Sequence, residues 1–153
     1  MRSRQLLTAI CLLALPVLAG AQIENPVKWT FKSKKINAQT WQIQIIASIE
    51  SGWHLYAQEA GEGPVPTTFK FKSNPLVTTS GKVKEVGKLR KSFDRNFNSE
   101  LKYYENQVSF VQTVSIVGKA ATDVKGIVEF MVCNDHECLP PKQVDFKIEV
   151  GGK

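Results

Sequence analysis

The sequence is poor in the residues that most often build catalytic and metal sites. Its 153 residues include only three cysteines, two histidines and two methionines. It contains no internal repeat, no low-complexity segment and no convincing helical periodicity, which excludes a solenoid and a helical bundle. Beyond the first 21 residues no apolar run approaches membrane-spanning length. We therefore expect a soluble, exported protein.

The first 21 residues have the layout of a secretory signal peptide. Arg2 and Arg4 give the positive start, and Leu6 to Leu18 is an apolar core of 13 residues. This core is too short for an ordinary transmembrane helix. Small residues follow it, so we predict cleavage after Ala21.

Cleavage would remove Cys11 and leave residues 22–153, which is a normal size for one domain. No cysteine follows the cleavage site as a lipid attachment point, so the sequence does not predict a lipoprotein. Cys133 and Cys138 remain. Two cysteines in an exported chain indicate a compartment that permits disulfides.

Positive charge is in mild excess. Without Arg2 and Arg4, 18 basic side chains face 14 acidic ones, a net charge of about +4. The lysines are scattered, whereas nucleic-acid binding proteins usually show a dense basic face with aromatic residues interleaved. The sequence therefore indicates a solvated surface and no nucleic-acid partner.

From Val27 onward, apolar and polar residues alternate with a period near two, and Gly, Pro or Asn punctuates the pattern. This pattern predicts an all-β protein of about eight or nine strands, and an immunoglobulin-like β-sandwich in particular. The segment from Glu59 to Pro66 has two glycines and two prolines and is expected to be a loop. Strands are expected at 27–32, 41–50, 52–56, 69–72, 103–117, 127–133 and 142–150, with a weaker one at 82–89.

The stretch from Met131 to Pro141 holds both remaining cysteines. Cys133 and Cys138 are separated by four polar residues, a spacing that can close a β-hairpin with one cysteine on each arm. Cys133 is expected near the end of its strand, with a semi-exposed side chain. A bridge between the two sheets, as in antibody domains, is excluded because the cysteines are so close in sequence.

Three uses of this pair stay open from spacing alone. A disulfide could simply pin the hairpin, although so small a loop removes little chain entropy. The pair could instead be redox-active. A copper site would combine Cys133, His136 and Met131, but it lacks a second histidine other than His54, and no methionine follows His136.

Four segments, taken in order, resemble the N-terminal periplasmic domain of DsbD-type thiol:disulfide interchange proteins. They are Gly52-Trp-His-Leu-Tyr56, Pro66-Thr-Thr-Phe69, the stretch from Phe97 to Tyr104, and Cys133-Asn-Asp-His-Glu-Cys138-Leu-Pro-Pro. The best-known members of the family have a slightly longer cysteine loop. They are also commonly fused to a membrane segment and a thioredoxin-like domain.

The resemblance implies an immunoglobulin-like domain in the periplasm whose cysteines, Cys133 and Cys138, cycle between dithiol and disulfide. It implies Phe97, with Phe93 as the rival, as an aromatic cap over the pair. His54 and Tyr56 match positions where the family has tyrosines beside the cysteines. The sequence stops at Lys153, so we expect a separate membrane-embedded thiol reductase as electron donor and periplasmic thioredoxin-fold proteins as acceptors.

Asp135 and Glu137 surround the pair with negative charge, which disfavours a thiolate, and His136 offsets this only when it is protonated. We therefore expect a pair that reacts slowly until a partner docks. No cofactor or metal is expected for thiol exchange. The competing hypothesis is an exported adaptor module with a structural disulfide, and copper binding is the third.

Overall fold

The protein, seen in a computed structural model that describes residues 24–95 and 97–152, is built from strands alone. The predicted signal peptide lies outside the described residues. The described residues contain no helix that could cross a membrane. The strands are β1 (Val27–Lys35), β2 (Thr40–Ile49), β3 (His54–Tyr56), β4 (Thr68–Phe71), β5 (Val77–Gly87), β6 (Arg90–Asp94), β7 (Ser99–Tyr104), β8 (Gln107–Ile116), β9 (Thr122–Phe130), β10 (Val132–Cys133) and β11 (Lys142–Val150).

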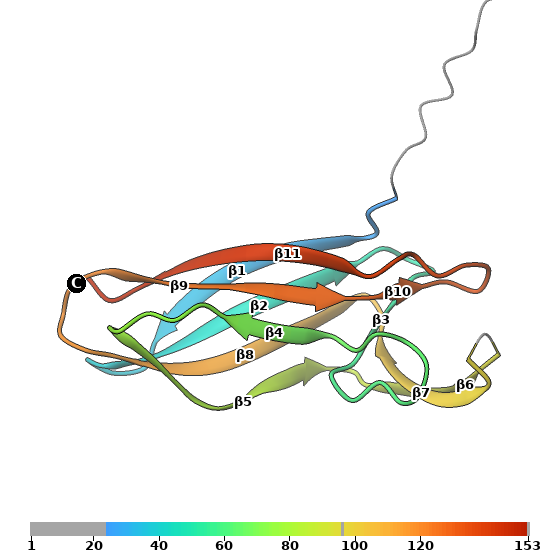
Figure 1. Ribbon diagram of the computed structural model, residues 1–153, viewed down its shortest axis with the longest axis horizontal. Coiled ribbons are helices and arrows are strands. Elements are labelled where there is room, and N and C mark those ends of the chain that lie inside the picture. The colour runs from blue at the N-terminus through green and yellow to red at the C-terminus, as the bar shows by residue number, and fades with distance from the viewer. Residues whose placement is uncertain (1–23, 96, 153) are drawn as a thin grey trace, which may run out of the picture.

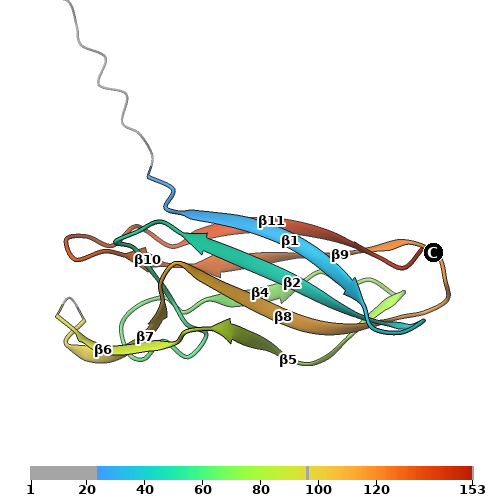
Figure 2. The same ribbon diagram turned by 180° about the vertical axis from the view of Figure 1, so that it is seen from behind.

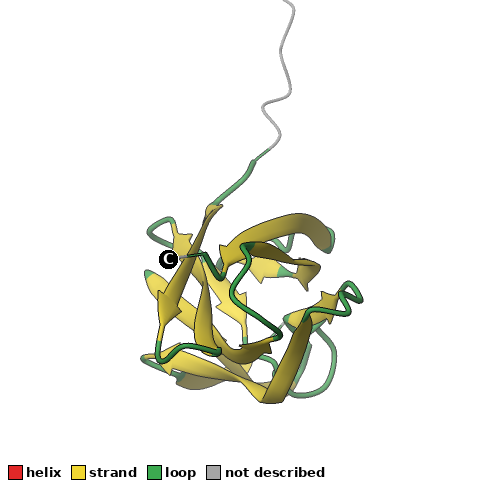
Figure 3. Cartoon of the chain, turned by 90° about the vertical axis from the view of Figure 1, so that its left-hand side faces the viewer, coloured by secondary structure: helices red, strands yellow, loops and turns green. Residues whose placement is uncertain are grey.

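Two antiparallel sheets form the layers of a sandwich (Figures 1 and 2). One has the order β1-β2-β8-β5 and the other β11-β9-β4. The view along the long axis shows the layers facing each other (Figure 3), and buried apolar side chains fill the space between them. This architecture confirms the predicted immunoglobulin-like β-sandwich.

The core follows directly from the alternation in the sequence. In β2, every second residue from Ile43 to Ile49 is buried, while Ser48 on the other face is exposed. Phe110 in β8 packs its ring against Trp29 of β1 and Phe69 of β4, so aromatic side chains join the two layers.

A third sheet, ordered β10-β3-β7-β6, lies at the end of the sandwich opposite the C-terminus (Figure 1). Its strands are short. Leu55 and His54 of β3 pair with Val132 and Cys133 of β10, and Tyr56 pairs with Tyr103 of β7. This end sheet therefore carries the first cysteine and both residues of β3 that the family resemblance singled out.

The prediction of eight or nine strands is too low because two long segments are interrupted. The segment 103–117 divides at Glu105 and Asn106, where Asn106 takes a left-handed φ of 63° and the chain passes from the end sheet into the sandwich. The segment 127–133 divides at Met131, between β9 and β10. Residues 90–94, for which the sequence predicted no strand, form β6.

Candidate functional site

Cys133 and Cys138 are joined by a disulfide that closes a tight turn. They face each other as an isolated antiparallel bridge, with Cα atoms 4.0 Å apart. Asn134 holds the turn: its side-chain Oδ1 accepts hydrogen bonds from the backbone N–H groups of His136 and Glu137, each at 2.8 Å. Such side-chain to backbone bonds are what makes asparagine a turn residue. The hairpin predicted from the spacing is therefore present.

The two cysteines differ in burial. Cys133 is fully buried, with 0% exposure, whereas Cys138 is half-buried. The expectation of a semi-exposed Cys133 is wrong because the break at Met131 interrupts the alternation. Val132 consequently enters the main core while Cys133 enters a second apolar cluster. Of the two sulfur atoms, that of Cys138 belongs to the more accessible residue.

The second cluster surrounds the disulfide with side chains from several elements. Its buried members besides Cys133 are Tyr56 of β3, Leu101 of β7 and Ala60, which belongs to the loop at 59–66. Phe97, Tyr103, Met131 and Cys138 pack against them and are partly buried. The cysteine pair therefore lies in an apolar setting at the end of the sandwich.

Phe97 lies on this cluster and Phe93 does not. Both belong to the β6–β7 hairpin, Phe93 in β6 and Phe97 in the connecting turn. The Phe97 ring meets the Tyr56 ring edge to face, with centroids 6.1 Å apart. Phe93 is 62% exposed and lines a groove instead. Of the two candidates for the cap, Phe97 is the one that packs against the cluster containing Cys133.

The predicted loop at 59–66 packs along β7 and meets Phe97. The backbone N–H of Lys102 donates to the carbonyl of Ala60 at 2.8 Å, and the Ser99 hydroxyl donates to the carbonyl of Glu62 at 2.8 Å. A Cβ atom on Gly63 would overlap the Phe97 ring, so any residue other than glycine at position 63 would force the ring to move. Phe97 therefore lies between Tyr56 on one side and this loop on another.

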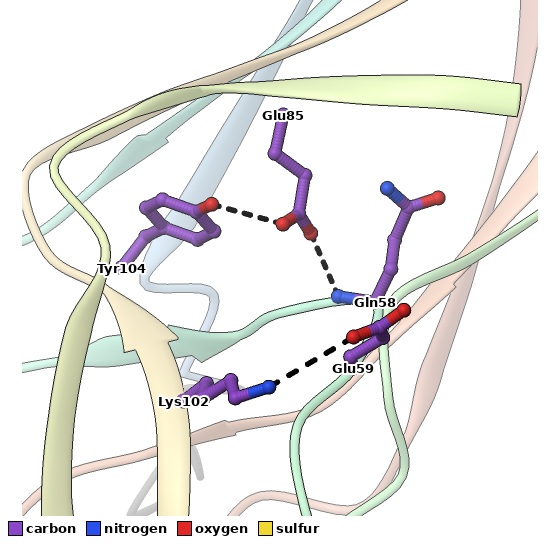
Figure 4. Close-up of polar contacts among 5 residues, drawn as sticks. All are labelled: Gln58, Glu59, Glu85, Lys102 and Tyr104. Atoms are coloured by element: carbon purple, nitrogen blue, oxygen red, sulfur yellow. Dashed lines mark hydrogen bonds and ion pairs between the residues drawn. The ribbon is translucent and has the colours of Figure 1, made fainter.

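Glu85 of β5 fixes the start of this loop (Figure 4). Its carboxylate accepts a 2.7 Å hydrogen bond from the backbone N–H of Gln58 and a 2.9 Å bond from the Tyr104 hydroxyl. Lys102 and Glu59 lie 3.8 Å apart beside it as a mostly exposed ion pair. A strand of the sandwich thus anchors the segment that leads into the loop.

His54 and Tyr56 are connected to Asp94 by hydrogen bonds. The Tyr56 hydroxyl donates to Asp94 Oδ2 at 3.4 Å, and His54 Nε2 lies 3.3 Å from the same hydroxyl oxygen. Burial, together with the negative charge of Asp94, raises the pKa of Tyr56 above its usual range. Burial lowers the pKa of His54. Directly opposed residues share a face of the sheet, so His54 projects on the same side as Cys133.

A groove of about 600 Å³ lies next to the cysteine turn. Asn134 and Asp135 of the turn form one part of its lining, His54 and Tyr103 another, and Phe93 a third. Asp135, His136 and Glu137 are all exposed. Within residues 24–95 and 97–152, no group of three or more His, Cys, Asp or Glu side chains is arranged to hold a metal ion.

Sequence reasoning did not identify Asp94 or Gly63 as parts of this site. The signal for Asp94 was indirect: it lies in a polar stretch that nevertheless contains two large aromatic residues. The contact of Gly63 with Phe97 joins two loops 34 positions apart, and no local pattern reveals such a pairing.

Comparisons with known proteins agree with this geometry. The family model for the N-terminal part of the thiol:disulfide interchange protein DsbD matches residues 22–149. The DsbD N-terminal domain of Neisseria meningitidis in its reduced form is similar in structure, with a TM-score of 0.51 and 17% identity over 80% of this chain and 86% of that one. The N-terminal periplasmic domain of ScsB from Proteus mirabilis gives a TM-score of 0.53 and 14% identity over 82% of this chain and 45% of that one.

No curated protein sequence matches the chain. At such low identity the two structural similarities support the fold alone. The family model is the stronger finding because it spans nearly all of the sequence after the predicted signal peptide and includes both cysteines. The chain therefore belongs to the family of the N-terminal domain of the thiol:disulfide interchange protein DsbD.

Proposed function

We propose that this protein is a periplasmic electron carrier in which Cys133 and Cys138 alternate between dithiol and disulfide. The observation that supports this most directly is the disulfide itself. It closes a turn of four residues at one end of the sandwich, with Cys133 buried and Cys138 partly exposed, and Phe97 packs against the same cluster. A bridge in this position contributes little to holding the two layers together, whereas it is well placed to meet a partner.

Cys138 is the cysteine that attacks the partner. In the reduced carrier its thiolate attacks one sulfur of the partner's disulfide, forming a mixed disulfide and releasing the other partner sulfur as a thiolate, which takes up a proton. The Cys133 thiol then loses its proton and attacks Cys138, which releases the partner as a dithiol. Two electrons pass to the partner, and the carrier keeps the Cys133–Cys138 disulfide. The greater exposure of Cys138 supports this order.

Membership of the DsbD N-terminal family supports a proposal for the partners. A membrane-embedded thiol reductase supplies electrons by the reverse exchange, and periplasmic thioredoxin-fold proteins receive them. Phe97 shields the pair between these encounters, with Gly63, Tyr56 and Asp94 around it. The signal peptide that ends at Ala21 delivers the chain to this compartment.

Trapping of the mixed disulfide tests the order of attack. In the Cys133→Ser variant, Cys138 can still attack but nothing resolves the product, so partners accumulate in mixed disulfides. The Cys138→Ser variant should trap far less. The two variants, expressed in the native host and compared on non-reducing gels with partners identified by mass spectrometry, are each other's control. Equal trapping by both would refute Cys138 as the attacking residue.

The reduction potential separates this carrier from an adaptor with a structural disulfide. Structural bridges in exported proteins usually have potentials below about −300 mV, whereas bridges that exchange electrons are higher. We expect the Cys133–Cys138 couple to lie above that value when equilibrated with redox buffers. A potential below it would favour the adaptor.

A further inference from the structure

Asp94 accepts hydrogen bonds from both the cap and the cluster beneath it. Its Oδ1 accepts from the backbone N–H of Phe97 at 3.3 Å, within the β6–β7 turn. Its Oδ2 accepts from the hydroxyl of Tyr56, which lies 38 positions earlier in β3. One carboxylate therefore connects Phe97, the residue proposed as the cap, to a fully buried residue of the cluster that contains Cys133.

We propose that Asp94 is a positioning residue that latches the Phe97 cap in the closed position by binding Phe97 and Tyr56 at once. This inference rests on the proposed function, since it assumes that Phe97 shields a redox pair. It adds the contact that controls how often Phe97 moves away from the cysteine pair.

The directions of the hydrogen bonds support this assignment. The Tyr56 hydroxyl has one proton and gives it to Asp94. His54 Nε2, which lies 3.3 Å from the same oxygen, must then be the donor of its own bond. The chain of donors from His54 through Tyr56, and the separate donor from Phe97, all end on the carboxylate of Asp94. A carboxylate can accept both bonds because it has two acceptor oxygens.

The lengths of these bonds suit a latch that opens. At 3.3 Å and 3.4 Å they are longer than the usual range for hydrogen bonds in proteins. The Phe97 ring also meets the Tyr56 ring edge to face and lies against Gly63, and these contacts involve no hydrogen bond. A partner that docks on the turn can therefore displace Phe97 by breaking either of these weak bonds, together with the packing of the ring on the cluster.

Alkylation of the reduced protein by iodoacetamide, a small uncharged probe, measures how often the cap opens. Rates are compared at the pH plateau where the thiols are fully ionised, so that removing the charge of Asp94 does not affect the comparison through the thiol pKa. Tyr56→Phe keeps the buried ring and removes only the hydroxyl. We expect Tyr56→Phe and Asp94→Ala each to raise the rate about five-fold, as the loss of one modest hydrogen bond predicts.

The double variant decides whether the two residues act through one bond. If they do, Tyr56→Phe combined with Asp94→Ala alkylates no faster than Asp94→Ala alone. If the rate increase of the double variant equalled the product of the two single rate increases, the latch would be wrong. Exchange of the Phe97 amide proton, followed by NMR in the oxidised protein, gives a second readout. It should be faster in Tyr56→Phe, although that change touches neither atom of the Phe97–Asp94 bond.

Tyr104→Phe is the matched control. Like Tyr56→Phe, it removes a hydrogen bond from a tyrosine hydroxyl to a carboxylate, here that of Glu85. It leaves the hydrogen bond from the Gln58 backbone N–H to Glu85 intact. It should lower the stability of the fold without changing the alkylation rate. Phe97→Ala distinguishes the shielding role of Phe97 from the latching role of Asp94. If Phe97→Ala is faster while Tyr56→Phe equals the wild type, the cap stands and the latch is wrong; if Phe97→Ala is unchanged, the shield and the latch are both wrong.

Discussion

At the scale of single residues, His54 is subject to two opposing influences. Burial lowers the pKa of its imidazole, and the carboxylates of Asp94, Glu105 and Asp135 act in the opposite direction without cancelling the effect of burial. The unfolded chain, with a histidine pKa near 6.5, therefore binds a proton at a pH where the folded protein does not. Stability from this group is present above pH 6.5 and is lost as the pH falls through the lowered pKa of the folded state.

We expect the urea concentration at the unfolding midpoint of the oxidised protein to decrease when the pH is lowered from 7.5 to 5. Part of that decrease should be absent in His54→Gln. Glutamine keeps a side-chain N–H that can donate to Tyr56 but does not titrate. His136→Gln is the matched control, because His136 is exposed on the cysteine turn. The same pH dependence in His54→Gln and in the wild type would show that burial of His54 has no such effect.

The residues of the site differ in how far the sequence could reveal them. The spacing of Cys133 and Cys138 was enough to predict a hairpin, because both partners belong to one short segment. The same alternation misjudged the burial of Cys133, since a single irregular residue, Met131, changes which side chains point inward. Asp94 acts through Tyr56, and contacts between residues 38 positions apart leave no trace in local patterns.

At the scale of elements, the site depends on two loops that meet around one ring. Gly63 takes a φ of +116°, which side chains other than glycine rarely adopt, and a Cβ there would overlap Phe97. We therefore expect Gly63→Ala to push Phe97 off the cysteines and to raise the alkylation rate of the reduced protein several-fold. It should also destabilise the fold by about 1–2 kcal/mol, the cost of a left-handed residue with a side chain.

Gly118→Ala is the control for that strain. Gly118 also has a positive φ, of +80°, but a Cβ atom added there would have no neighbouring atom within 4 Å. It should lose only the part of the stability that comes from backbone strain, measured by urea unfolding, and keep the wild-type alkylation rate. Equal rates for Gly63→Ala and Gly118→Ala would mean that the loop does not hold Phe97 in place.

The strands were easier to predict than their interruptions. The sequence of β2 alternates over most of its length, apart from Ile46, because every second residue from Ile43 to Ile49 faces the core. The divisions at Met131 and at Asn106 arise where the chain passes between the sandwich and the end sheet. That passage is a property of the tertiary structure, so strand periodicity within either segment could not show it.

At the scale of the whole molecule, two apolar clusters have separate tasks. The larger one fills the sandwich between β1-β2-β8-β5 and β11-β9-β4, and the smaller one surrounds the cysteines at the end sheet. A carrier has to stay folded in both of its redox states. The disulfide lies outside the main core, so the proposed carrier is expected to keep its two layers packed when the bond is reduced.

Reduction of the disulfide should therefore cost less stability than a single change in the core. By the chain-entropy relation, a closed loop of about six residues contributes at most about 2 kcal/mol. Phe110 is fully buried between Trp29 and Phe69, and Phe110→Ala should cost about 3–5 kcal/mol. Urea unfolding of the oxidised protein, the reduced protein and oxidised Phe110→Ala makes the comparison at one pH. If reduction unfolded the domain, or cost more than Phe110→Ala, the disulfide would be a structural staple, and a carrier that cycles through the dithiol would be ruled out.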